Sequence, residues 1–182
     1  MEFTRTLQRK AGKYFLSKKL KHFSRIRQMY TLKTAQTAGI LITPSNPDSF
    51  EQIKEFLNYL TKTGVKVFVL GYVDEKKVPD NFIFWKGLNL LSRNELNWAG
   101  IPESPVVSDF IDQPFDMLID LSLHDYFPVQ YIANLSKSQF KIGRFANSNN
   151  CYDLMFEINE DSSLNYYIEH LTYYLNLLSN PN

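Results

Sequence analysis

The sequence predicts an α/β fold, a doubly wound and mostly parallel sheet with helices on both faces, preceded by a basic amphipathic N-terminal helix. After residue 37, short apolar segments alternate with segments of helical period, which is typical of such sheets. The apolar segments are almost continuously hydrophobic, as strands buried on both faces are. With 182 residues, the chain suffices for one domain and an appendage. We therefore divide it into a basic helical arm with a linker, 1–37, and a Rossmann-like domain, 38–182.

The arm is defined by its charge. Residues 1–33 contain ten Lys or Arg and one acidic residue, a net charge of +9, whereas residues 34–182 carry −8. Between Thr4 and Tyr30, apolar residues recur in steps of three and four, a helical period. The apolar line changes phase near Gly12, which predicts two helical segments or one bent helix.

The domain begins with a βαβ pattern. The run "AGILIT" at 38–43 predicts a strand, and Ser49 with Gln52 forms a capping-box pattern at the start of a helix that ends near Gly64. A second strand follows at 65–70. The two strands are expected to be parallel.

The remaining elements follow in order. The middle predicts a short strand at 81–85 and a helical turn at 92–98 that ends by Gly100. Further on, the pattern predicts strands at 115–121, 140–143 and 152–158, with helices at 128–137 and 162–178.

Part of this pattern resembles known proteins. The segment 115–145, "FDMLIDLSLHDYFPVQYIANLSKSQFKIGRF", the later "YDLMFEI" and the "LNW" at 96–98 resemble an uncharacterised family of small proteins from Bacteroidota. The resemblance covers the whole chain and implies a basic arm before an α/β body, with no established activity.

The same segment is similar to the N-terminal half of heptosyltransferase-type glycosyltransferases. There, an aspartate-ended strand, a helix and an "RIG"-like strand follow one another, as Asp120, the helix near 131–135 and residues 141–143 do here. The loop after the first strand lacks the glycine of those enzymes, and no second, donor-binding domain is expected. The similarity is at the level of the fold and does not fit a complete glycosyltransferase.

Ligands of doubly wound sheets bind beyond the carboxyl ends of the strands. Three loops, 43–49, 71–74 and 122–125, are expected to meet there. In the first, Thr43, Ser45 and Ser49 offer hydroxyl groups near a helix N-terminus, a possible anion-binding site. No Gly-rich phosphate loop or dinucleotide fingerprint accompanies them, so we expect no cofactor.

The third loop supplies candidate catalytic residues, because Asp120, His124 and Asp125 are of types that perform acid–base chemistry. A structural interpretation competes, in which Asp120 caps local amides and Asp125 begins a helix. We favour the structural interpretation and expect a non-catalytic protein.

A metal site and a membrane-spanning segment have little support. One cysteine, Cys151, cannot supply a disulfide framework or a thiolate cluster, and three scattered histidines predict no metal site. No run of about 20 apolar residues and no signal peptide is evident. We expect a soluble, cytoplasmic protein.

The basic arm is the strongest functional signal, and three hypotheses account for it. The first is RNA or a ribonucleoprotein as partner, with the ribosome or its assembly intermediates as specific instances, bound through phosphate contacts. The second places the arm on an anionic membrane surface, with Phe3, Leu7, Phe15, Leu16, Leu20 and Phe23 in the interface. In the third, which is structural, the arm packs its apolar side on the body, and its charge is a solvated face that balances the −8 elsewhere. The predicted RNA-binding residues are Arg5, Arg9, Lys10, Lys13, Lys18, Lys19, Lys21, Arg25 and Arg27.

Overall fold

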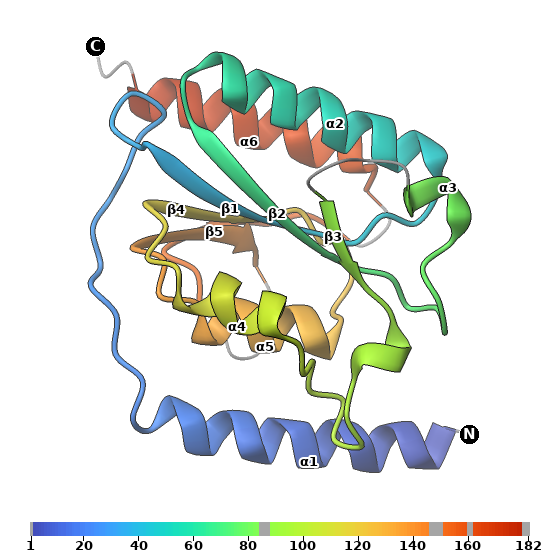
Figure 1. The fold of residues 1–182 in the computed structure, drawn as a ribbon. Coiled ribbons are helices and arrows are strands. Elements are labelled where there is room, and N and C mark those ends of the chain that lie inside the picture. The colour runs from blue at the N-terminus through green and yellow to red at the C-terminus, as the bar shows by residue number, and fades with distance from the viewer. Residues whose placement is uncertain (1, 84–87, 146–150, 160–161, 180–182) are drawn as a thin grey trace.

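A six-stranded parallel sheet forms the centre of the molecule (Figure 1). The computed structural model describes residues 2–83, 88–145, 151–159 and 162–179, with the backbone alone at 2–5, 81 and 83. The strands are β1 (Thr37–Ile42), β2 (Lys66–Tyr72), β3 (Leu88–Leu91), β4 (Met117–Asp120), β5 (Phe140–Arg144) and β6 (Leu154–Phe156). Their order, β3-β2-β1-β4-β5-β6, is that of Rossmann folds and confirms the predicted doubly wound sheet.

Helices cover both faces of the sheet, as predicted (Figure 1). The helices are α1 (Glu2–Leu20), α2 (Pro47–Lys62), α3 (Asp80–Ile83), α4 (Pro105–Asp112), α5 (Phe127–Leu135) and α6 (Leu164–Ser179). Helices α2 and α6 lie together on one face, and α4 and α5 lie on the other. Helix α1 forms an additional layer outside α5.

Strand β1 shows why the strands are hydrophobic almost without interruption. Its side chains alternate between the two faces, so that Ile40 and Ile42 pack toward α2 and α6, while Leu41 packs toward α4 and α5. Both faces are covered, and both sets of side chains are buried. The βαβ unit of β1, α2 and β2 is confirmed with parallel strands, and Thr37 pairs with Lys66.

The start of α2 differs from the prediction. The N-cap is Asn46, whose side chain accepts a hydrogen bond from the Ser49 amide at 2.8 Å, and Pro47 occupies the first helical turn. Ser49 is therefore the third helical residue, with its own hydroxyl facing back to the cap, and the predicted pairing with Gln52 is wrong. The predicted end near Gly64 is confirmed, since α2 stops at Lys62 and Gly64 has φ of +92°.

The middle of the chain was predicted least well. Residues 80–83 form the short helix α3 rather than a strand, and the strand at this edge of the sheet is β3, which begins at Leu88. Residues 84 and 85 of the predicted strand lie outside the described residues. The helical turn before Gly100 is present as a 3₁₀ turn at Arg93–Glu95, and α4 was not predicted.

The arm is one helix followed by extended chain. Helix α1 ends at Leu20 and is followed by a turn in which the Phe23 amide donates to the Leu20 carbonyl. Residues 24–30 make no helical hydrogen bonds, so the predicted helix up to Tyr30 is wrong. Tertiary contacts account for the difference, because the Gln28 amide donates to the Gln139 carbonyl at 3.2 Å. Of the apolar residues in this stretch, Leu20, Phe23 and Tyr30 pack against the body, whereas Ile26 is 74% exposed.

Candidate functional site

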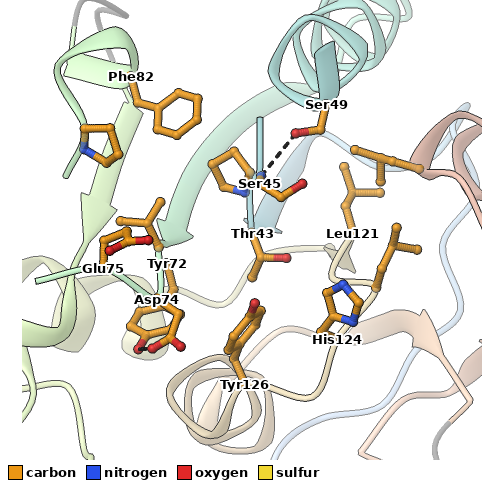
Figure 2. Close-up of a pocket in the computed structure, with 15 residues that line it drawn as sticks. Thr43, Ser45, Ser49, Tyr72, Asp74, Glu75, Phe82, Leu121, His124 and Tyr126 are labelled. Carbon is orange, nitrogen blue, oxygen red and sulfur yellow. Dashed lines mark hydrogen bonds between the residues drawn. The ribbon is translucent and has the colours of Figure 1, made fainter. Parts of the chain in front are cut away.

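The loops that follow β1, β2 and β4 meet at the carboxyl edge of the sheet. Strands β1 and β4 are neighbours from which the chain winds in opposite directions, so a crevice opens between their loops. The crevice holds a cavity of about 370 Å³. Residues from all three predicted loops line it, which confirms that they converge (Figure 2). The polar residues on its wall are Thr43, Ser45, Ser49, Tyr72, Asp74, Glu75, His124 and Tyr126.

In the first loop, 43–49, polar groups form hydrogen bonds with one another. The Ser49 hydroxyl accepts from the amides of Ser45 and Asn46, at 3.1 and 3.2 Å, and donates to the Asn46 carbonyl at 2.8 Å (Figure 2). Pro47 has no amide hydrogen to offer, and Asp48 adds negative charge to the first turn. Of the predicted anion ligands, Thr43 and Ser45 line the cavity with their side chains, whereas Ser49 belongs to the helix cap.

The second loop forms an acidic wall. The Tyr72 hydroxyl donates to Asp74 Oδ1 at 2.9 Å, and burial together with this hydrogen bond raises the pKa of Tyr72. Arg93 lies behind the wall, with Nε 3.3 Å from Asp74 and Nη2 3.7 Å from Glu75. Burial also raises the pKa of Tyr126, whose ring centroid is 5.5 Å from that of Tyr72. The sequence predicted the loop 71–74 as part of the site, and this range includes Tyr72 and Asp74. It singled out no side chain in the loop, and Glu75, Arg93 and Tyr126 lie outside the range.

The structure does not bring Asp120, His124 and Asp125 together in one site. His124 lines the cavity and is exposed, and Asp125 points to Arg144, 2.7 Å away. Asp120 is buried beneath, where its carboxylate accepts hydrogen bonds from the Ser122 amide at 2.8 Å and from the Tyr152 hydroxyl. The structural interpretation is confirmed for Asp120, which caps a local amide, but is wrong for Asp125, since the N-cap of α5 is Tyr126 and Asp125 pairs with Arg144 instead.

Two tyrosines hold Asp120 in place. Besides Tyr152, which acts on the carboxylate, the Tyr167 hydroxyl donates to the Asp120 carbonyl at 2.8 Å. Burial raises the pKa of Asp120 and of both tyrosines. Because Tyr152 is far along the chain, in the segment between β5 and β6, no local pattern in the sequence could have identified it as the partner.

The cations of the arm are found in two environments. Arg9, Lys10, Lys13, Lys18, Lys19 and Lys21 are exposed and form no ion pair with a described carboxylate. Arg27 is exposed, 3.8 Å from Asp153. Arg25 is different, because its side chain is 4% exposed and is engaged by Asp153 and by backbone carbonyls. The side chain of Arg5 lies outside the described residues.

Helix α1 is docked on the body by its apolar side. Gly12 lies so close to Phe127 and to the Ala99 carbonyl that a Cβ would come within 2.4 and 2.5 Å of them. Leu16 is buried in the same cluster as Phe127 and Tyr131. This packing is the one that the third, structural hypothesis expects, and it leaves the charged side of the helix facing outward.

A family model matches residues 8–178, that is, nearly the whole arm and body. The chain belongs to a family of unknown function, DUF6913. This confirms membership of an uncharacterised family. No curated protein matches the sequence.

In this DUF6913 protein, the described residues contain neither a metal-binding cluster nor a membrane-spanning helix. No group of three or more His, Cys, Asp or Glu side chains within that part of the chain is arranged to hold a metal ion. No described helix is both long and apolar enough to span a membrane.

Proposed function

We propose that the protein binds RNA, free or in a ribonucleoprotein such as the ribosome, through the outward side of α1. The observation that carries the proposal is the set of six exposed cations, from Arg9 to Lys21, that have no carboxylate partner in the described structure. A polyphosphate backbone neutralises such a row by releasing counterions. Free rather than paired charges are what this mode of binding requires.

Self-neutralisation by the acidic body accounts poorly for the charge. The body has a net charge of −8, yet of the eight predicted RNA-binding cations whose side chains the structure describes, Arg25 and Arg27 alone form ion pairs with a described acidic side chain, and both pair with Asp153. Lys18 and Lys19 lie over the rings of Tyr14 and Tyr131, at 4.7 and 5.4 Å. These contacts orient the ammonium groups and leave them positively charged.

RNA is favoured over an anionic membrane because docking uses much of the apolar side of the arm. Leu16 is buried against the body, and Leu20 and Phe23 pack on the same cluster. A helix that lies in a bilayer interface needs its apolar face free for the acyl chains. Leu7 and Phe15 are exposed, and the side chain of Phe3 is outside the described residues.

The test replaces two cations of α1 and one of the turn that follows it, without disturbing the docking of the helix. Lys10, Lys13 and Lys21 are exposed, and the triple substitution to Gln keeps their length. Binding of labelled single-stranded RNA is expected to weaken, and the slope of log affinity against log salt to become shallower by about 2. The matched control is the triple Gln substitution of Lys62, Lys76 and Lys77, exposed lysines of the body. Equal behaviour of the two variants would contradict the proposal. Deletion of residues 1–30 is less informative, since it would uncover the apolar cluster beneath α1.

A second candidate function is binding of a small molecule in the cavity at the carboxyl edge, as in a glycosyltransferase-like or nucleotide-binding enzyme. A volume of about 370 Å³ is in the range of ligand sites. Hydroxyl groups and carboxylates line the cavity, and its described lining includes no Lys or Arg. These groups suit a sugar or nucleoside moiety better than a phosphate.

Thermal denaturation with nucleosides, nucleotides and sugar nucleotides tests the second candidate, because a ligand that prefers the folded state raises the melting temperature. The control is Thr43→Phe, which places a ring in the cavity. A shift that is present in the wild type and lost in T43F supports a site there. A melting temperature that no compound in the panel changes argues against it.

A further inference from the structure

Three aromatic side chains form an exposed cluster beside the cations of α1. Trp98 is 72% exposed and Tyr14 is 55% exposed, and Phe15 lies between them on the surface. The ring centroids of Phe15 and Trp98 are 5.8 Å apart with an interplanar angle of 86°, and those of Tyr14 and Phe15 are 5.8 Å apart at 66°. Because neighbouring rings meet edge to face, they do not stack on one another, and the large exposed fractions of Trp98 and Tyr14 leave these rings accessible to a ligand.

The cluster joins two parts of the chain that are far apart in sequence, and both are held firmly. Trp98 lies in a turn in which the Asn97 side chain accepts from the amides of Ala99 and Ile101, at 2.8 and 3.1 Å. Gln8 of α1 donates to the Asn97 carbonyl at 3.4 Å. Burying so large an aromatic surface normally stabilises a protein, so its exposure on a well-ordered turn indicates a binding surface.

One cation lies over a ring of the cluster, and others belong to the same helix. The Lys18 ammonium group lies 4.7 Å from the centre of the Tyr14 ring, and the other exposed cations of α1 lie along the same helix. Aromatic faces next to positive charge are the combination by which proteins bind single-stranded nucleic acid, since bases stack on the rings while phosphates meet the cations. A duplex offers phosphates too, but its bases are already stacked and paired.

We infer that Tyr14, Phe15 and Trp98 form a stacking platform for unpaired bases, so that the RNA bound by α1 is single-stranded at this point. The inference rests on the proposed function and adds the class of RNA. The cations supply affinity for any RNA, and the platform supplies the preference for unpaired regions. The preference is for strandedness and not for sequence, because every base has a face that stacks.

The experiment compares a single strand with a duplex of the same length, at about 50 and 200 mM salt. In the wild type, the single strand binds more tightly. Trp98→Ala and Tyr14→Ala are each expected to weaken single-strand binding by about 5- to 100-fold, with duplex binding unchanged. Tyr173→Ala is the matched control, because Tyr173 is 63% exposed on α6, away from the arm. It is expected to bind both RNAs as the wild type does.

A spectroscopic measurement detects stacking directly. The chain has two tryptophans, Trp85 and Trp98, so the Trp85→Phe variant reports on Trp98 alone. Addition of a single strand is expected to quench its emission, and addition of the duplex is not.

The outcomes separate the platform from the proposed function. If W98A and Y14A bind single strands as the wild type does, while the Lys10, Lys13 and Lys21 triple variant loses binding, the platform is refuted and the RNA proposal stands. If the wild type binds neither RNA, both fail. If it binds phosphatidylcholine vesicles containing phosphatidylserine instead, and W98A abolishes this, the cluster is a membrane anchor and both are overturned.

Discussion

The guanidinium of Arg25 donates two hydrogen bonds to the carboxylate of Asp153, 2.8 Å to Oδ1 and 2.7 Å to Oδ2. The same guanidinium donates to the carbonyl of Gln139 at 2.8 Å, and Asp153 Oδ2 also accepts from the Lys141 amide at 2.9 Å. One pair thus ties the extended part of the arm to strand β5 and to the segment before β6.

Loss of this pair is expected to destabilise the fold. Arg25→Ala leaves the Asp153 carboxylate without its main cationic partner, and breaking a largely buried pair from one side costs about 3 kcal/mol. Chemical denaturation measures the change. The control is Arg27→Ala, since Arg27 is 74% exposed and 3.8 Å from the same carboxylate, and its loss is expected to cost less than about 1 kcal/mol. Similar costs for the two variants would contradict the assignment of Arg25 to the fold.

Docking of α1 is expected to depend on Gly12. Gly12→Val would drive a branched side chain into the Phe127 ring and the Ala99 carbonyl, which in a packed interface costs about 1–3 kcal/mol. The helix is expected to leave the body more often, so that proteinase K cleaves residues 21–36 faster. Lys13→Val is the control, because it makes the same β-branched change on the exposed side. If both variants resist cleavage as the wild type does, Gly12 is not the point of closest approach.

The elements that the sequence predicted are those in which local pattern and burial agree. In the β1, α2 and β2 unit, the strands are buried on both faces and the helix ends at a glycine with positive φ, so the local signals are complete. Helix α4 escaped prediction although Ser104 and Pro105 begin it. It has eight residues, with Val107 and Phe110 as its buried side chains, too few to show a helical period.

Long-range contacts explain what sequence alone could not predict. The helical period up to Tyr30 was misleading because Arg25 finds Asp153, 128 residues away, and that contact overrides local propensity. At the carboxyl edge, the loops were predicted because parallel strands end together. Which side chains face the cavity depends on the conformation of each loop. His124 lines the cavity, whereas Asp120 is buried and accepts a hydrogen bond from Tyr152.

The hydrogen bond from Tyr152 to Asp120 is expected to contribute to stability. Tyr152→Phe removes the donor and leaves a buried acceptor with one partner fewer, which costs about 1–3 kcal/mol in the free energy of unfolding. The control is Tyr166→Phe on α6, because Tyr166 is exposed. A Y152F variant as stable as the control would show that the hydroxyl is dispensable.

Asp120 itself is expected to give the stability a dependence on pH. Burial raises its pKa above the ordinary 3.8, so the folded protein retains the proton to a higher pH than the unfolded chain. The stability gained from this proton is complete below pH 3.8 and is lost as the pH rises through the folded pKa. Asp120→Asn cannot titrate, so the wild type is expected to lose stability relative to D120N from pH 4 upward. Urea denaturation at several pH values measures this, and parallel profiles would rule it out.

Lys141 is expected to act in the opposite direction at alkaline pH. Its ammonium group is buried at the end of α5, where it donates to the carbonyls of Ala133 and Asn134 at 2.6 and 3.1 Å, and burial lowers its pKa from 10.5 to about 8. Between pH 8 and 10.5 the unfolded chain holds the proton and the folded protein does not, so stability rises with pH over this range. The same stability is lost as the pH falls through the folded pKa of about 8. From pH 8 to 10 the gain is about 2 kcal/mol.

The neighbours of Lys141 decide how this gain is measured. The charges of Arg25, Arg27 and Asp153 act on Lys141, as does Cys151. Burial raises the pKa of Cys151 from 9.0 to about 11, and that shift removes stability as the pH rises. We therefore compare Lys141 with Lys141→Met in a Cys151→Ala background. The stability of the lysine protein relative to K141M is expected to rise by about 2 kcal/mol between pH 8 and 10. A constant difference would mean that Lys141 titrates in the folded protein as it does in the unfolded chain.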